Sequence, residues 1–139
     1  LTEDPMETVF TKIMHNQIPS VRLHEDELCI AILDISPVNK GHVLVISREP
    51  YPTIADCPVE TLGHLMSVVK RIDAVLREKL HADATNIVIN NGPAAGQEVP
   101  HLHIHVIPRH DHDGKRFIPP KEKYGEGELE RMGKLLRLD

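Results

Sequence analysis

The sequence predicts one α+β domain, with a mostly antiparallel β-sheet and a long helix over one face of that sheet. Two patterns predict this class. Short segments of strand character are joined by short loops, and one long segment repeats its apolar residues with the helical period. The 139-residue chain is 40% apolar and 27% charged, which is typical of globular domains. A chain of this length buries roughly 70% of its unfolded surface, which is enough for one core.

The N-terminal half begins with a helix pattern and continues with strand patterns. Apolar residues at helical spacing predict a short helix over residues 8–16, and Pro19 ends it because proline has no backbone N–H to donate. Alternating apolar residues predict a strand over 20–25, and continuous apolar runs predict buried strands over 29–33 and 42–46. Short loops join these strands, so we expect them to pair as antiparallel neighbours.

The longest predicted element is a helix in the middle of the chain. Apolar residues recur with a period of about 3.6 residues from Val59 to Leu80. We expect Asp56 or Cys57 to cap this helix and Pro58 to lie in its first turn.

The C-terminal half contains two further strand patterns. They cover residues 86–90 and 101–107, with a glycine-containing loop at 91–97 between them. Pro108 is expected to end the second strand, because it cannot donate to a ladder. A short amphipathic helix is expected near residues 128–137.

Charge and composition limit the classes of partner. The net charge of −5 and the aromatic content of 3% disfavour binding to anionic membranes and stable binding to nucleic acids. Two cysteines suggest no disulfide framework, and no signal peptide or long apolar run is visible, so we expect a cytoplasmic protein. We expect residues 1–7 to be a disordered tail or tag remnant, residues 8–114 to form the domain, and residues 115–139 to be a tail with a short helix in the same domain.

Three histidines alternate with apolar residues in the last predicted strand. Side chains of a strand alternate between its faces, so His101, His103 and His105 are expected on one face. A solvated face with incidental histidines is the simplest interpretation. It does not explain three imidazoles in strict alternation beside a glycine-containing loop.

The spacing of the three histidines along the strand bears on whether they bind a metal ion or include a nucleophile. His101 and His105 would lie about 13 Å apart along a strand, whereas Zn–N bonds are about 2.0–2.1 Å. This spacing disfavours one zinc ion shared by all three histidines, whereas His103 and His105 could share one with a ligand from elsewhere. The alternative is that a neutral imidazole attacks phosphorus and forms a covalent phosphohistidine. His103 suits this role because a histidine on each side could hold the phosphate oxygens.

The loop before this strand is a candidate phosphate site. Gly96 allows close approach of the backbone to a ligand. Successive N–H groups of Gln97, Glu98 and Val99 could form an anion-binding concavity. Such a loop alone is usually only a turn, and its position directly before the histidines is what gives it significance.

Residues 101–107, His-Leu-His-Ile-His-Val-Ile, resemble the signature of the histidine-triad (HIT) family. The similarity extends over residues 8–114 through four other segments: 10–19, 33–37, 41–46 and 90–100. It implies a two-layer α+β protomer with a five-stranded sheet, which joins a second copy in a homodimer with a ten-stranded sheet. It also implies hydrolysis or transfer of a nucleoside monophosphate through a nucleotidyl-histidine, with no cofactor.

The resemblance also implies roles for particular residues, with an AMP-like purine nucleotide as the ligand. The nucleophile and the histidines around the phosphate match His103, with His101, His105 and His42. The residue that binds the ribose hydroxyls matches Asp34. The phosphate and leaving-group loop matches Asn90, Gly96, Gln97, Glu98 and Val99. The apolar slot for the base matches Phe10, Ile13, Ile18, Ile32 and Ile35.

The sequence departs from the family pattern in two places. Glu98 stands where well-known members have a Ser or Thr that can donate to the leaving group, so the proton donor is open, with a protonated Glu98 as one candidate. Some relatives hold zinc with a Cys-x-x-Cys pair near the N-terminus. Thr8 and Thr11 stand at those positions, and Cys29 and Cys57 do not replace them, so we expect no metal.

These patterns predict a hydrolase that acts on a nucleoside 5′-phosphoramidate or a dinucleoside polyphosphate. Two alternatives remain: a nucleotide-binding regulatory protein with little turnover, and a nucleotidyltransferase. The sequence specifies neither the base nor the leaving group.

Overall fold

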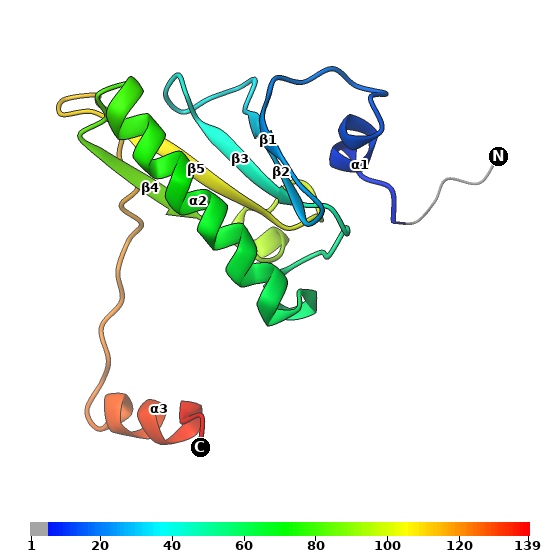
Figure 1. Ribbon diagram of the computed structural model, residues 1–139. Helices are drawn as coiled ribbons and strands as arrows, with labels where there is room; N and C mark the ends of the chain where they lie inside the picture. Colours follow the sequence, from blue (N-terminus) through cyan, green and yellow to red (C-terminus); the bar gives the residue numbers. More distant parts are fainter. Residues whose placement is uncertain (1–5) are drawn as a thin grey trace.

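The computed structural model describes residues 6–139 and has one five-stranded sheet at its centre (Figure 1). Its strands are β1 (Arg22–Glu25), β2 (Cys29–Leu33), β3 (Val43–Ser47), β4 (Ala84–Val88) and β5 (His103–Arg109). They lie in the order β1-β2-β3-β5-β4, and every pairing is antiparallel. The predicted α+β class is confirmed. Most of the expected tail over residues 1–7 lies outside the described residues.

The long helix α2 (Val59–Lys79) lies across one face of the sheet and packs on β3 and β5 (Figure 1). Its buried side chains recur every three or four residues: Leu65, Val68, Val69, Ile72 and Leu76. They form the larger core together with Leu102, Ile104 and Val106, which alternate with the histidines. Each such buried side chain contributes about 1.5–3 kcal/mol of hydrophobic free energy. The core on this side therefore fixes which face the histidines occupy.

The short helix α1 (Val9–Met14) covers part of the opposite face of the sheet. Thr8 caps it, because its side-chain oxygen accepts hydrogen bonds from the backbone N–H groups of Phe10 and Thr11. Phe10 and Ile13 pack on the second apolar cluster, whose strand residues are Ile30, Ile32, Leu44 and Ile46. This smaller core leaves part of the face open, and the histidines lie beside the opening.

The last strand begins and ends later than predicted. β5 starts at His103 and continues through Pro108 to Arg109, so the expectation that Pro108 ends it is wrong. The pairing with β3 stops at Val106, and beyond it β5 pairs only with β4. A proline is tolerated there because one side of the strand needs no N–H donor. β4 also begins two residues before its predicted start, at Ala84.

The predicted cap of the long helix is also wrong. Pro58 itself is the N-cap residue of α2, and no side chain caps that end. Asp56 instead completes a capping box with Thr53 in the short 3-10 helix η1 (Ile54–Asp56). The Asp56 carboxylate is therefore used one element earlier than expected.

The first strand contains a β-bulge. Arg22 lies opposite Ile32, but His24 lies opposite Ala31, so Leu23 has no partner of its own. A bulge shifts the alternation of side chains by one residue. Arg22 and His24 consequently face opposite sides of the sheet, although they are two residues apart, and Leu23 is exposed.

The C-terminal helix α3 (Glu128–Leu136) lies apart from the sheet in Figure 1, and none of its residues is buried. An irregular segment connects it to β5. Across residues 6–139, no helix has both the length and the apolar character needed to span a membrane.

Candidate active site

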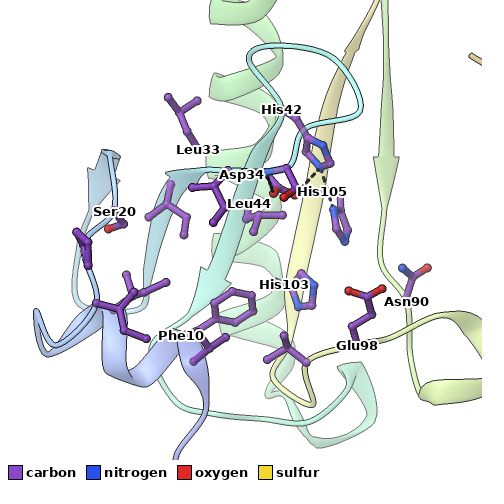
Figure 2. A pocket seen from close by; sticks show the side chains of 18 of the residues that line it. Phe10, Ser20, Leu33, Asp34, His42, Leu44, Asn90, Glu98, His103 and His105 are labelled. Carbon is purple, nitrogen blue, oxygen red and sulfur yellow. Dashed lines mark hydrogen bonds and ion pairs between the residues drawn. The ribbon is translucent and has the colours of Figure 1, made fainter. Parts of the chain in front are cut away.

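A cavity of about 620 Å³ opens beside α1, between β2, β3, β5 and the loop that precedes β5 (Figure 2). This volume is within the range of small-molecule sites. All predicted site residues except His101 and Gln97 line it. Further lining residues, which the sequence pattern did not single out, are Val9, Pro19, Ser20, Leu33, Ser36 and Leu44. Strand alternation could have identified Leu44, because it lies two residues after His42 and shares its face.

The ring of His103 is held in one orientation. It packs edge-to-face on Phe10, with ring centroids 4.9 Å apart, and its Nδ1 lies 2.6 Å from the carbonyl oxygen of His101. A carbonyl oxygen only accepts, so Nδ1 carries the proton and Nε2 keeps its lone pair. Within residues 6–139, no group hydrogen-bonds to that Nε2. His103 is therefore a neutral imidazole whose free nitrogen can act as a nucleophile.

His101 lies beneath the cavity and is fully buried. Its Nε2 donates to the carbonyl oxygen of Ser47 at 2.6 Å, and its Nδ1 accepts from the hydroxyl of Thr8 at 2.7 Å. Both ring nitrogens are thus engaged within the protein, and the structure does not place this side chain around a bound phosphate. What His101 contributes is its backbone carbonyl, which orients His103.

A chain of hydrogen bonds determines the tautomer of His105. The backbone N–H of Val38 donates to His42 Nδ1 at 3.1 Å, so His42 carries its proton on Nε2. That proton is donated to His105 Nδ1 at 2.9 Å (Figure 2). His105 Nε2 must then carry the remaining proton of the neutral ring. A ligand in the cavity would meet an N–H donor at His105 beside the bare nitrogen of His103.

Burial keeps these histidines uncharged. Desolvation lowers the pKa of His42, His101 and His103 below the ordinary value of 6.5. The pKa of His105 falls to about 4, first because of burial and then because of the neighbouring imidazoles His103 and His42. At neutral pH His103 is therefore unprotonated.

The loop before β5 is braced from within. Gln97 Oε1 accepts from the N–H of Gly92, and its Nε2 donates to the carbonyl oxygen of Pro52. The backbone N–H of Gln97 also donates to the carbonyl oxygen of Gly92. The prediction that this N–H binds an anion is therefore wrong. Among the described residues, none accepts from the N–H groups of Glu98 and Val99. These two amides are the free donors of the loop.

Two carboxylates line the cavity. Asp34 Oδ1 accepts from the backbone N–H of Ser36 at 2.9 Å, while Oδ2 lies 3.6 Å from His42 Nε2. Glu98 is exposed, and Figure 2 shows its carboxylate near Asn90 and His103. Ile35, at 93% exposed, forms part of the rim. The cavity thus has one end with histidines and polar groups and one apolar end beside α1.

The residues at the N-terminal position of the family's zinc pair do not fit a zinc ion. Zinc binds Cys, His and carboxylate ligands, whereas this position holds Thr8 and Thr11. The Thr8 hydroxyl is bonded to His101, and the Thr11 hydroxyl lies 2.8 Å from the backbone nitrogen of Thr8. These hydroxyls cap α1 and hold His101 in place.

Comparison with known proteins identifies relatives along most of the chain. A family model described as HIT domain matches residues 15–112. The adenylylsulfatase HINT3 of Arabidopsis thaliana is 39% identical over 105 residues, which are 76% of this chain but only 53% of that protein. The adenosine 5′-monophosphoramidase HNT1 of Saccharomyces cerevisiae is 35% identical over 129 residues, 91% of this chain and 77% of that protein. An uncharacterized HIT-like protein of Methanocaldococcus jannaschii is 45% identical over 107 residues, 77% of this chain and 82% of that protein.

A solved structure extends this similarity to three dimensions. The crystal structure of a HIT family protein from Bacillus anthracis superposes with a TM-score of 0.85 at 34% sequence identity. The match covers 97% of this chain and 96% of that one. The two proteins therefore share their fold over nearly their whole length.

Proposed function

The chain belongs to the HIT family, and from that premise we propose that it hydrolyses a nucleoside 5′-phosphoramidate or a dinucleoside polyphosphate through a nucleotidyl-His103 intermediate. Relatives named as an adenylylsulfatase and an adenosine 5′-monophosphoramidase support an adenylyl-containing substrate. The names of both relatives denote hydrolases that act on adenylyl compounds.

The observation that carries the proposal is the fixed tautomer of His103. Its proton is held on Nδ1 by the carbonyl oxygen of His101, so the lone pair of Nε2 is available without prior deprotonation. The lowered pKa, caused by burial, keeps it available at neutral pH. An activated nucleophile with an orienting partner is the arrangement that covalent catalysis requires.

Neutral hydrogen-bond donors would hold the phosphate. Among the described residues that line the cavity there is no Lys or Arg, so the negative oxygens would be bound by His105 Nε2–H and by the backbone N–H groups of Glu98 and Val99. Donors fixed before the reaction begins stabilise charge that develops in the transition state. Asp34 would accept hydrogen bonds from the ribose hydroxyls, and the base would occupy the apolar end lined by Ile13 and Ile32.

The reaction would proceed in two displacements. The lone pair of His103 Nε2 forms a bond to phosphorus, and the bond from phosphorus to the leaving group breaks. Its electron pair goes to the leaving group, which takes up a proton. Water then attacks phosphorus and gives up a proton to solvent, the electron pair of the P–Nε2 bond returns to the imidazole, and a nucleoside monophosphate is released.

Comparison of two substrates with the parent protein and His103→Ala tests the proposal. The parent should cleave an adenosine phosphoramidate, a diadenosine polyphosphate, or both, and the variant should lose at least about 10⁴-fold in kcat. His110→Ala, on the turn after β5, is the matched control and should keep its activity. Binding of AMP without cleavage of either substrate would favour a regulatory nucleotide-binding protein. Transfer of AMP to an added acceptor at the expense of hydrolysis would favour a nucleotidyltransferase.

We also propose that two copies associate through their sheets. Among residues 6–139, β4 is an edge strand with a partner only on its β5 side, and Ile87 on it is 45% exposed. Such an edge pairs readily with another strand, and a copy of itself would give a continuous ten-stranded sheet. Light scattering should give the mass of a dimer for the parent and of a monomer for Ile87→Lys. A monomeric parent at high micromolar concentration would contradict the dimer.

A further inference from the structure

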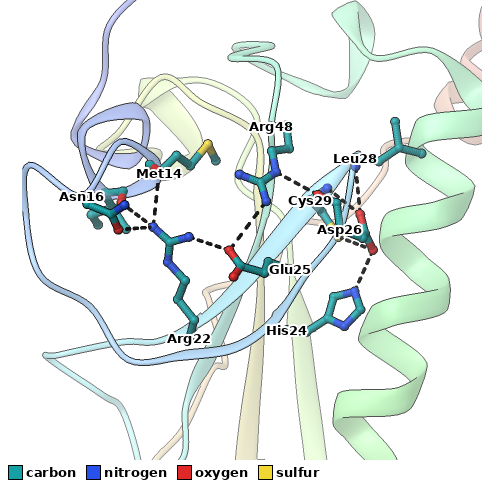
Figure 3. Close-up of polar contacts among 10 residues, drawn as sticks. Met14, Asn16, Arg22, His24, Glu25, Asp26, Leu28, Cys29 and Arg48 are labelled. Atoms are coloured by element: carbon teal, nitrogen blue, oxygen red, sulfur yellow. Dashed lines mark hydrogen bonds and ion pairs between the residues drawn. The ribbon is translucent and has the colours of Figure 1, made fainter.

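A second cluster of polar side chains lies on the α2 side of the sheet, at the hairpin between β1 and β2 (Figure 3). Asp26, in the hairpin turn, has its Oδ2 2.6 Å from His24 Nε2 and 2.7 Å from His64 Nε2 of α2. Cys29 Sγ lies 3.6 Å from the same oxygen. The hairpin and α2 thus bring two imidazoles and a thiol to the same carboxylate oxygen.

The local backbone fixes two of these four side chains. Asp26 Oδ1 accepts from the backbone N–H groups of Leu28 and Cys29, at 2.8 and 2.9 Å. This leaves Oδ2 to face the other three groups. The bulge in β1 sets His24 opposite Ala31, whose side chain belongs to the core under α2. His24 is therefore directed to the same face as Cys29.

Three of the donor atoms have separations close to those of a tetrahedral metal site, and His64 contacts the Asp26 oxygen among them. The donor atoms of His24, Asp26 and Cys29 all lie within 4.8 Å of one another. Zinc bond lengths give tetrahedral edges of about 3.5 Å between sulfur and oxygen and about 3.3 Å between nitrogen and oxygen. The Cys29–Asp26 separation already matches. The two imidazole nitrogens would have to move about 0.6 Å away from Asp26 Oδ2. Their side chains are 24% and 35% exposed and have room to move.

The charges of the cluster suit a divalent cation. Burial would raise the pKa of Asp26, but hydrogen bonds from His24, His64 and the backbone hold it well below its ordinary value, so the carboxylate is ionised. Burial and then the Asp26 charge raise the pKa of Cys29 to about 12. The thiol would give up its proton only to a cation at the site, and two negative ligands would then balance a 2+ charge. The nearby Arg48 pairs with Glu25 instead.

We propose that His24, Asp26, Cys29 and His64 bind one divalent metal ion of the zinc class. Two nitrogens, one oxygen and one sulfur form a ligand set that zinc accepts in closed, structural sites. The ion ties the β1–β2 hairpin to α2. It lies on the face of the sheet opposite the cavity, so it holds the scaffold and takes no part in the chemistry at His103. The proposal departs from the expectation of no metal, and it stands whether or not the protein is a hydrolase.

Titration of tag-free protein with Co²⁺ alone tests the site. Cobalt bound by a thiolate gives a sulfur-to-metal charge-transfer band in the near ultraviolet, which marks Cys29. Asp34, His42 and His105 also lie within 4.8 Å of one another at their donor atoms, but without sulfur a cobalt ion there gives no such band. We expect one equivalent of Co²⁺ to produce the band and one equivalent of Zn²⁺ to displace it. Zn²⁺ alone should raise Tm by several degrees.

Matched variants assign the ligands. Cys29→Ala should abolish the band and Cys57→Ala, the other buried cysteine, should keep it. His24→Ala and His64→Ala should bind Co²⁺ at least about tenfold more weakly, since even the loss of an outer-sphere partner costs that much. Circular dichroism checks that each variant is folded. If Cys29→Ala does not fold, the affinities of His24→Ala and His64→Ala for Co²⁺ test the site, because both side chains are partly exposed. No band in the parent, a band in Cys29→Ala, or unchanged affinity in either histidine variant would overturn the site.

Discussion

The chemistry of each histidine depends on which of its nitrogens the protein already uses. Both ring nitrogens of His101 and both of His42 are hydrogen-bonded within the protein. His105 and His103 each have one ring nitrogen that faces the cavity without a partner among the described residues. The two free nitrogens differ, because one carries a proton and the other a lone pair. A bare nitrogen and an N–H donor therefore face the cavity side by side, and neither imidazole is charged.

The pH dependence of turnover follows from the lowered pKa values. Protonation of His103 removes the lone pair, and burial moves this step below the ordinary histidine value of 6.5. The pKa of His105 lies lower still, at about 4. We expect kcat/KM for a nitrophenyl ester of AMP, whose leaving group needs no proton, to decline at acid pH with a midpoint below 6.5. A midpoint at or above 6.5 in the pH–rate profile would contradict the assigned protonation state.

Glu98 is predicted to give the leaving group its proton. Asp34 is hydrogen-bonded to Ser36, whereas the carboxyl of Glu98 has no partner among the described residues that line the cavity. Glu98→Gln cannot transfer a proton, so it should slow the cleavage of substrates with basic leaving groups by about 10²-fold or more. Cleavage of a nitrophenyl ester of AMP, whose leaving group needs no proton, should hardly change.

The control for this effect is Glu60→Gln, an exposed carboxylate on α2. It should leave both substrates unaffected. Equal slowing of both substrates by Glu98→Gln would mean that Glu98 positions the nucleotide and does not donate a proton.

Single residues were predictable where their environment is local. Strand alternation placed His103 and His105 on one face, and both line the cavity. It could not reveal that His101 precedes β5, because the start of a strand depends on its partner β3. Nor could it reveal that Gln97 braces the loop through Pro52, which is far away in the sequence. Such side-chain hydrogen bonds depend on the tertiary fold.

At the scale of the element, the loop before β5 combines a rigid brace with two free amides. Gly96 has φ +94°, a conformation that L side chains rarely adopt, while open space surrounds the position of a Cβ. Glycine is therefore required at position 96 by the positive φ angle and not by a lack of space for a side chain. The amides of Glu98 and Val99 follow directly, so their direction depends on this turn.

A pair of glycine substitutions tests this dependence. Gly96→Ala should strain the loop by about 1–2 kcal/mol and raise the Kd for AMP. Gly63→Ala, in α2, meets equally open space but has an ordinary φ, so it should stabilise the protein by about 0.5–1 kcal/mol and leave the Kd unchanged. Thermal unfolding and calorimetric titration with AMP measure both. Equal affinity in Gly96→Ala and the parent would show that the turn does not orient the phosphate donors.

Elements with long, regular patterns were predicted well, and irregular ones were not. β2 has its predicted bounds because its apolar run is continuous. The bulge in β1 could not be predicted from alternation, which would have put Arg22 and His24 on one face. That bulge directs His24 toward α2, so the cluster around Asp26 could not be predicted from the sequence. Its fourth member, His64, comes from another element altogether.

At the scale of the whole molecule, the sheet separates the hydrophobic core under α2 from the functional face beside α1. Burying uncharged histidines on the functional face makes stability depend on pH. Their pKa values are lower in the folded state than the ordinary 6.5. The unfolded chain therefore binds more protons between pH 6.5 and about 4, and stability falls as the pH falls through this window.

Chemical denaturation at several pH values measures this loss. The free energy of unfolding should be level near pH 7.5 and should decrease below 6.5, with His105 contributing up to roughly 3 kcal/mol by pH 4. The lowered pKa of Asp26 and Asp73 adds a further loss only below the ordinary carboxyl value of 3.8. His105→Gln, which cannot titrate, should flatten the decrease between pH 6.5 and 4. An equally steep decrease in that variant would contradict the assignment.

The central claim is that His103 Nε2 forms a covalent bond to phosphorus. The most direct measurement is rapid acid-free quenching of the protein with an adenosine phosphoramidate, followed by mass spectrometry of the intact chain and of the peptide that bears His103. We predict a transient adduct with the mass of one adenylyl group, located on His103, that forms and decays at rates compatible with turnover. Hydrolysis of the substrate at full rate with no adduct on His103, or with an unchanged rate in His103→Ala, would contradict it.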